Sequence, residues 1–347
     1  VNLNNLTFIN GKVNGRGGAI YVSNNANYNF SLSNSNFTNN SASVDGGAIF
    51  FESRFDDNSI VNCNFNFNTA GYGGGAIYTG FADSIRSGSL IITNSNFTSN
   101  KASYGAAFCS CMRAIVTNST FTSNKAGQGG AISAFYVGYM KVFNSTFDSN
   151  NGTDGGAVYS GVEFTGSGLT FTNNIAVTNG GAISSGSSNI AVSNSTFIDN
   201  SANNMGGSIY APGVLNVKDS TFNSTNITGK AVIYINNNNK NVNLTNNTIQ
   251  SILLPIYNNN GNIISPTTLT FNNVTADVGK NAKLTATLKD DNGNLIGSNI
   301  NVAGKVNGTA SNFVFDETTQ NFTSIYTPQN IGKYSITGTY SKASNYN

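Results

Sequence analysis

The chain has 347 residues, and its 17 lysine and arginine residues nearly balance its 15 aspartate and glutamate residues. This near-neutral balance gives no electrostatic reason to expect nucleic acid or an anionic membrane as a partner, and no apolar run approaches the length of a membrane span. The chain is rich in Asn, contains 38 Gly and lacks His and Trp, a composition that favours strands and turns over helices.

Two motifs recur from the first residues to about residue 257. The first is an aromatic residue followed three positions later by Asn, and the second is a Gly pair followed by a small and an apolar residue. The aromatic positions are Phe8, Phe37, Phe65, Phe97, Phe121, Phe147, Phe171, Phe197, Phe222 and finally Ile249. The apolar positions are Ile20, Ile49, Ile77, Phe108, Ile132, Val158, Ile183, Ile209, Ile233 and Ile256.

The spacing of these motifs predicts the fold. The distance from the aromatic to its apolar partner is nearly constant, whereas the return to the next aromatic varies, so insertions fall in one loop of each repeat. A period of this length without a helical pattern predicts a parallel β-helix of about ten coils over residues 1–257. Identical positions then stack at about 4.8 Å.

Stacking assigns a role to each repeated residue. We expect the aromatic and the Ser two positions before it to point inward, and the Thr between them to point outward. The Asn residues should form a ladder of amide hydrogen bonds, and the Gly pairs should form tight corners with positive φ. The ladder residues are Asn40, Asn68, Asn100, Asn124, Asn150, Asn174 and Asn200.

The Phe-x-x-Asn and Gly-Gly-Ala-Ile motifs resemble the repeats of the chlamydial polymorphic outer-membrane proteins. They are also similar to the Asn-rich coils of adhesin-like surface proteins of methanogenic archaea, which carry immunoglobulin-like modules behind them. The resemblance implies an exported protein at the cell surface with a role in adhesion. We therefore expect an export signal and an anchor to lie outside this segment.

The composition changes after residue 257. Two Pro residues and an Asn run predict a linker over residues 258–268. Short alternating segments separated by turn signals follow, and they predict an immunoglobulin-like β-sandwich over residues 269–347 that acts as a spacer. The fold class is therefore all-β, with a β-helix followed by a small sandwich.

An enzyme is the first alternative, because β-helices also carry polysaccharide lyases and glycosidases. The candidate charged residues lie in two variable loops: Arg54, Asp56, Asp57, Asp83 and Arg86. Adjacent carboxylates in a loop point in different directions, and without His the usual general base is missing. We interpret these residues as a solvated loop, with ligand or ion binding as the alternative, and expect no catalytic residue, no metal and no cofactor.

Three Cys residues bear on the compartment. Cys63 takes an inward Ser position, whereas Cys109 and Cys111 should share the opposite face of one strand, where a disulfide would require strain. Three free thiols on an exported protein suit a strictly anaerobic habitat, in agreement with the methanogen resemblance. A metal site at the isolated Cys-x-Cys is the alternative.

Asn-x-Ser/Thr sequons are frequent, and the strand sequons should lie on the outward face. Chance alone predicts almost as many, so glycosylation and no modification both remain open. The glycosylation candidates are Asn36, Asn96, Asn118, Asn144, Asn194, Asn226 and Asn321.

Exposed aromatic residues form the last candidate site. Phe135, Tyr136 and Tyr139 lie in one variable loop, and Arg113 lies in the loop of the neighbouring coil. Together with the charged loop residues above, they predict a binding edge for a surface glycan or protein, and local packing is the alternative. The function expected is that of a non-catalytic adhesin-like stalk. The structural alternative is a repeating unit of a filament or wall layer, joined end to end through exposed coil edges.

Overall fold

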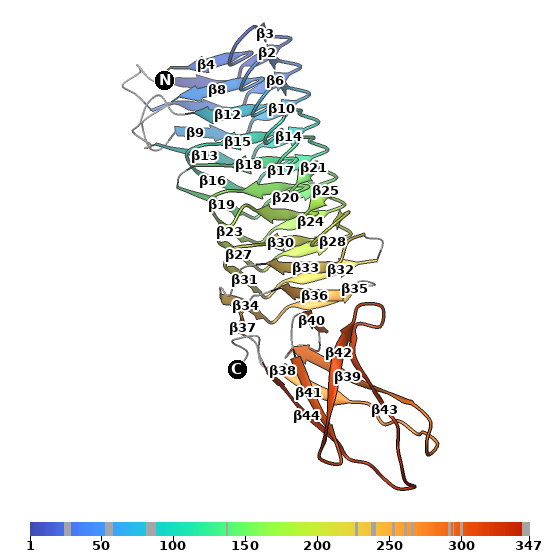
Figure 1. The fold of residues 1–347 in the computed structure, drawn as a ribbon. Coiled ribbons are helices and arrows are strands. Elements are labelled where there is room, and N and C mark those ends of the chain that lie inside the picture. The colour runs from blue at the N-terminus through green and yellow to red at the C-terminus, as the bar shows by residue number, and fades with distance from the viewer. Residues whose placement is uncertain are drawn as a thin grey trace.

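The structure is a computed structural model, and it contains a parallel β-helix with an antiparallel sheet at its C-terminal end (Figure 1). It describes residues 1–23, 29–52, 58–80, 88–136, 138–225, 228–236, 241–251, 254–259, 262–264, 267–290, 293, 295–298 and 301–341. This confirms the predicted all-β class and the β-helix.

Three long parallel sheets run along the β-helix, and we name them A, B and D in the order in which each coil visits them. Sheet A contains β1 (Asn2–Asn4), β5 (Ser31–Ser33), β9 (Asn58–Val61), β13 (Ser89–Thr93), β16 (Arg113–Thr117), β19 (Tyr139–Phe143), β23 (Glu163–Ser167), β27 (Ile190–Ser193), β31 (Leu215–Lys218), β34 (Asn241–Thr245) and β37 (Asn262–Ile264). Sheet B contains β2 (Thr7–Ile9), β6 (Asn36–Thr38), β10 (Asn64–Asn66), β14 (Asn96–Thr98), β17 (Thr120–Thr122), β20 (Thr146–Asp148), β24 (Thr170–Thr172), β28 (Thr196–Ile198), β32 (Thr221–Ser224) and β35 (Thr248–Ser251).

Sheet D contains β4 (Ile20–Val22), β8 (Ile49–Glu52), β12 (Ile77–Gly80), β15 (Phe108–Ser110), β18 (Ile132–Ala134), β22 (Val158–Ser160), β26 (Ile183–Ser185), β30 (Ile209–Ala211), β33 (Ala231–Asn236), β36 (Leu254–Asn259) and β40 (Ile296–Ser298). Short strands between sheets B and D make a discontinuous side, which we name sheet C. They are β3 (Lys12–Val13), β7 (Ser41–Ala42), β11 (Thr69–Ala70), β21 (Asn151–Asp154), β25 (Ile175–Asn179) and β29 (Ser201–Ala202).

The repeated aromatic residues form one continuous stack inside the β-helix. Each pairs in register with the next from Phe8 to Ile249, and successive rings from Phe8 to Phe222 have centroids 4.5 to 4.9 Å apart. The Ile ladder of sheet D also runs as predicted, from Ile20 paired with Ile49 to Ile233 paired with Ile256. The sequence therefore predicted the register of both sheets correctly.

The Asn ladder is present and buried. From Asn40 to Asn174, each amide nitrogen donates to the side-chain oxygen of the Asn one coil further on, as Asn124 does to Asn150 at 3.0 Å and Asn150 does to Asn174 at 2.9 Å. The same amide also donates to a backbone carbonyl, and the side-chain oxygen accepts from a backbone N–H, so each interior rung satisfies four hydrogen bonds.

The corners of the coil explain why Asn is so common. The turn from sheet A to sheet B places a residue at positive φ, and this residue is Asn in most coils, for example Asn118 and Asn144 at φ 51° and 47°. Asn tolerates this left-handed conformation better than other non-Gly residues.

The Gly pairs correct one part of the prediction. Only the first Gly of each pair has positive φ, as Gly155 does at 67°. The second is required for a different reason, because a Cβ on Gly156 would lie 2.0 Å from the carbonyl oxygen of Gly181. The pair thus combines a turn conformation with a close approach of two backbones.

Six antiparallel strands form the C-terminal sheet in the order β38 (Thr267–Phe271), β39 (Ala282–Asp290), β43 (Asn321–Tyr326), β42 (Thr309–Asp316), β41 (Asn301–Val306) and β44 (Ile336–Ser341). β42 changes partner along its length, pairing with β41 up to Phe313 and with β43 from Val314. The end strands β38 and β44 approach each other without pairing, so the sheet nearly closes on itself. The immunoglobulin-like assignment stays a prediction.

The two parts of the chain are joined by more than the expected linker. Residues 258–268 include the end of β36, all of β37 and the start of β38. β40, which lies between β39 and β41 in the chain, leaves the C-terminal sheet and pairs in parallel with β36, for example Ile256 with Ile296. Sheet D of the β-helix thus continues into the C-terminal part.

Candidate functional site

The predicted site residues fall into three groups. Arg54, Asp56, Asp57, Asp83 and Arg86, with the sequon residue Asn226, lie outside the described residues. Phe135 and Tyr136 lie beside the outer face of sheet D. Tyr139 and Arg113 begin strands of sheet A.

Phe135 and Tyr136 belong to a group of five rings that we name the aromatic cluster: Tyr72, Tyr104, Phe135, Tyr136 and Tyr159. Ring centroids are 4.9 Å apart between Tyr72 and Tyr104, and 5.5 Å apart between Tyr104 and Phe135. Phe135 also lies 5.7 Å from Tyr159 and 6.1 Å from Tyr136. The cluster therefore connects residues from four successive coils.

Small residues beneath the cluster make room for it. The outward positions of sheet D pair Tyr78 with Cys109, Cys109 with Ser133, and Ser133 with Tyr159. Two consecutive coils thus carry a small residue where their neighbours carry a Tyr. Tyr104 lies at the corner before β15 and Phe135 in the loop after β18, so both rings reach the cluster from outside the strands. Phe135 is half-buried and packs locally, while its neighbour Tyr136 remains exposed to solvent. The packing and binding interpretations are therefore compatible.

Tyr136 is the most unusual member of the cluster. Its φ is 72°, in the left-handed region, although it is a bulky residue, and 64% of its surface is exposed. Such a conformation costs on the order of 1–3 kcal/mol and persists where the surroundings impose it, often at binding sites. Burial does not offset this cost, because most of the side chain is in solvent.

The phenol groups of the cluster lie close enough to influence one another. Burial raises the pKa of Tyr72, and the neighbouring Tyr104 and Tyr136 raise it further. Burial and the Asp154 carboxylate raise the pKa of Tyr159. Both phenols are thus protonated at neutral pH and can donate hydrogen bonds beside an apolar ring face.

Tyr139 and Arg113 form a separate group on the outer face of sheet A. The Nζ atom of Lys141 lies 4.5 Å from the centroid of the Tyr139 ring, and Tyr139 pairs in register with Glu163. A Cβ on Gly138 would lie 2.6 Å from Cγ of Arg113, so the Arg113 side chain packs against this loop. The structure therefore splits the predicted aromatic loop between two sheets.

The remaining sequons are accessible. Asn36 and Asn96 are exposed on the outer face of sheet B. Asn118, Asn144 and Asn194 are exposed at the left-handed corners between sheets A and B, and Asn321 is half-buried at the start of β43. Glycosylation stays a prediction at these positions.

The Cys residues are buried free thiols. β15 ends at Ser110, so Cys111 lies beyond the strand rather than on one face of it with Cys109, and its Sγ atom donates to the Tyr78 hydroxyl at 3.4 Å. Burial raises the pKa of the Cys109 thiol well above its usual value, which disfavours the thiolate that a metal would need. Across the described ranges, no three His, Cys, Asp or Glu residues are grouped to hold a metal ion.

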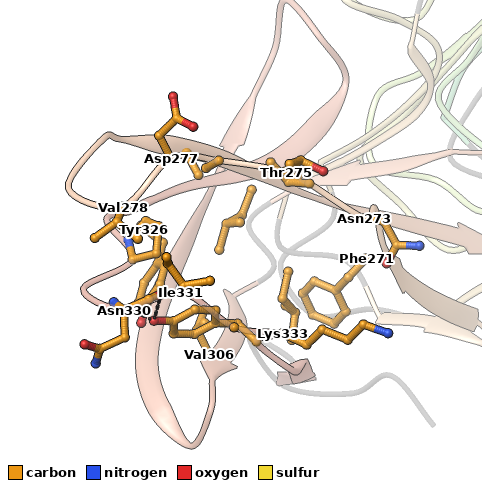
Figure 2. Close-up of a pocket in the computed structure, with 18 of the residues that line it drawn as sticks. Phe271, Asn273, Thr275, Asp277, Val278, Val306, Tyr326, Asn330, Ile331 and Lys333 are labelled. Carbon is orange, nitrogen blue, oxygen red and sulfur yellow. Dashed lines mark hydrogen bonds between the residues drawn. The ribbon is translucent and has the colours of Figure 1, made fainter.

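A cavity of ≈ 900 Å³ opens in the C-terminal part (Figure 2). Phe271, Val306 and Tyr326 line it, together with the segments that follow β38 and precede β44. It lies where these two end strands fail to pair, and Ile331 at its margin is 96% exposed. Its charged lining residues, Asp277 and Lys333, stand apart (Figure 2), so no set of polar groups converges on a ligand position.

Sequence reasoning missed Tyr72, Tyr104 and Tyr159. Tyr104 directly precedes a corner Gly and Tyr72 lies two residues before one, where most other coils carry non-aromatic residues, and this departure was the available signal. Tyr159 occupies the outward position of β22 directly after the apolar ladder residue.

Four segments of the chain, residues 34–52, 118–134, 168–186 and 194–212, match the sequence profile of the Chlamydia polymorphic membrane protein repeat. No curated protein and no solved structure matches the chain. The chain is thus similar to that repeat family in its coils, as the motifs predicted, and the likeness to archaeal surface proteins stays a prediction. Within the described ranges, no helix has the length and hydropathy needed to cross a membrane.

Proposed function

We propose that this chain is part of an exported, cell-surface, adhesin-like protein: a rigid, non-catalytic β-helix that contacts a surface glycan or protein through its aromatic cluster. The observation that carries the proposal is Tyr136, an exposed ring held in a left-handed conformation within a cluster of five rings. Exposed aromatic rings on a rigid scaffold supply stacking area to sugars and anchor partner side chains.

Two further features support a surface location. The repeat family whose profile matches four segments is named for membrane proteins of Chlamydia. Free, buried thiols suit an exported protein of a strictly anaerobic organism, such as a methanogenic archaeon. In this proposal the C-terminal sheet is an immunoglobulin-like spacer that holds the β-helix away from the cell.

Adhesion of the purified chain to glycan arrays and to candidate cells tests the proposal. We expect the Tyr72→Ala, Tyr136→Ala double variant to lose most binding at an unchanged melting temperature. The triple variant Phe135→Ala, Tyr136→Ala, Tyr139→Ala should behave in the same way. Tyr139→Ala alone is the matched control, because its ring lies on sheet A. Wild-type binding by the double variant would contradict the proposal.

The filament alternative depends on free coil edges. At the C-terminal end of sheet D, β40 already pairs with β36 and covers that edge, which disfavours end-to-end joining through it. The enzyme alternative depends on the carboxylates at positions 56, 57 and 83, which lie outside the described residues. A screen for degradation of polysaccharides would detect such an activity directly.

A further inference from the structure

Two lysines lie near the aromatic cluster, on the side of the β-helix between sheets B and D. Lys101 and Lys125 form a parallel bridge on neighbouring coils, and both are exposed. Neighbouring rungs lie about 4.8 Å apart, and like charges directly opposite each other are destabilising. Their own neighbours along this row, Thr69 and Asn151, are neutral. The β-helix therefore holds two adjacent positive charges that nothing on the same row offsets.

Within the part of the chain that the structure describes, neither lysine forms an ion pair. Two carboxylates close to the cluster are engaged elsewhere. Asp45 is buried, pairs with Arg16 at 3.1 Å and accepts from the Gly73 N–H at 3.2 Å. Asp154 accepts hydrogen bonds from Thr178 and Asn179. The two lysines are thus available to an anion from outside the chain.

The lysines are close to the cluster along the chain and in space. Lys101 precedes Tyr104 by three residues, a distance of at most about 11 Å between Cα atoms. The backbone N–H groups of Ser103 and Tyr104 both donate to the carbonyl oxygen of Tyr72, at 2.9 Å each. The lysines, Tyr72 and Tyr104 therefore lie at one corner of consecutive coils, and long lysine side chains can reach a ligand that rests on the rings.

We propose that the aromatic cluster binds an acidic polysaccharide, whose sugar rings stack on Tyr72 and Tyr136 and whose carboxylates pair with Lys101 and Lys125. This inference rests on the proposed function, because it specifies the ligand of the same surface. Ring faces supply contact area that any sugar can use, whereas the paired lysines select for negative charge. A neutral glycan would leave the repulsion between the two ammonium groups in place.

The test measures binding of the whole chain to polygalacturonate and to neutral dextran at low and moderate salt. We expect tighter binding to polygalacturonate and a loss of affinity as salt increases. The Lys101→Gln, Lys125→Gln variant should lose at least about five-fold in affinity for polygalacturonate and most of the salt dependence. The matched control is Lys218→Gln, Lys230→Gln, which removes the same charge from exposed positions elsewhere on the β-helix.

The outcomes separate this inference from the proposed function. Equal binding of both polysaccharides, lost in the Tyr72→Ala, Tyr136→Ala variant but not in the lysine variant, would overturn the acidic ligand and leave the binding surface intact. Equal losses in the test and control lysine variants would reduce the effect to net charge and overturn the site. No binding of polygalacturonate by the wild-type chain would also overturn it.

Discussion

The β-helix and the C-terminal sheet are both built from strands, but they use their residues differently. In the β-helix a given position meets the same kind of residue in the coils above and below, so Phe147 contacts Phe121 and Phe171 with ring centroids at 4.7 and 4.8 Å. In the C-terminal sheet each contact occurs once, as between Phe315 and Phe322 at 5.2 Å. A substitution inside the β-helix therefore changes contacts with two neighbouring coils, and its effect on stability is correspondingly larger.

The largest expected effect concerns the aromatic stack. Phe147→Ala should destabilise the β-helix by about 3–5 kcal/mol, because it leaves a cavity between two rings. Thr146→Ala, one residue away on the exposed face, should cost less than about 1 kcal/mol. Denaturant unfolding followed by circular dichroism measures both. Equal losses of stability would contradict the prediction that Phe147 points inward and Thr146 outward.

The Asn ladder provides the second test. Asn150→Ala should cost about 2–4 kcal/mol, because it removes four hydrogen bonds and leaves the backbone N–H and one amide N–H of the buried Asn124 without a partner. The comparison in the C-terminal sheet is Asn321→Ala, which removes a half-exposed residue that bonds to Thr287 and Thr319 and should cost about 1 kcal/mol. If the two variants unfold at the same denaturant concentration, the ladder is not a source of extra stability.

Glycine corners sharpen the comparison further. Gly155 and Gly279 have similar positive φ values of 67° and 74°, but a Cβ on Gly155 would lie 2.2 Å from the carbonyl oxygen of Val158, whereas nothing lies within 4 Å of the position on Gly279. Gly155→Ala should therefore cost more than about 2 kcal/mol and Gly279→Ala about 1 kcal/mol. Differential scanning calorimetry measures the loss of stability in both variants. A larger loss for Gly279→Ala than for Gly155→Ala would contradict the prediction.

The repetition of positions in the β-helix, and its absence from the C-terminal sheet, also explains which parts of the structure the sequence predicted. In the β-helix, periodicity identified the inward Phe stack, the Ile ladder and the Asn ladder, because one position repeated many times is a strong signal. The Asn corners were missed, since an Asn before Ser-Thr-Phe carries the same letters whether it lies in a strand or in a left-handed turn. In the C-terminal part no position repeats, so strands were predicted but the excursion of β40 onto β36 was not.

The binding surface was predictable only in part, for the same reason. Phe135 and Tyr136 were recognisable as a departure from the repeat. Their partner Tyr72 contributes from two coils earlier, and no spacing rule predicts that side chains from separate corners meet in one cluster. Contacts between irregular positions depend on loop conformation, which local sequence determines weakly.

The smallest expected effect concerns the pH dependence of stability, which should have opposite signs for two carboxyl groups. Burial raises the pKa of Asp45 in the β-helix, although Arg16 partly counteracts it. Hydrogen bonds with Thr319 and Lys283 lower the pKa of the half-buried Asp316 in the C-terminal sheet from 3.8 to about 2. Asp45 therefore contributes stability below pH 3.8 that is lost as the pH rises through its raised value, whereas the contribution of Asp316 is present above pH 3.8 and lost toward pH 2.

Melting temperatures of Asp45→Asn and Asp316→Asn, each compared with the wild type across the acid range, measure these signs. We expect the advantage of the wild type over Asp45→Asn to shrink as the pH increases above 3.8, because the buried carboxyl group becomes ionised in the folded state. Its advantage over Asp316→Asn should instead grow as the pH increases from about 2 to 3.8. If the two differences change with pH in the same direction, burial does not dominate at Asp45. Its ion pair with Arg16 would then stabilise the corner of the β-helix in the way that Lys283 stabilises Asp316.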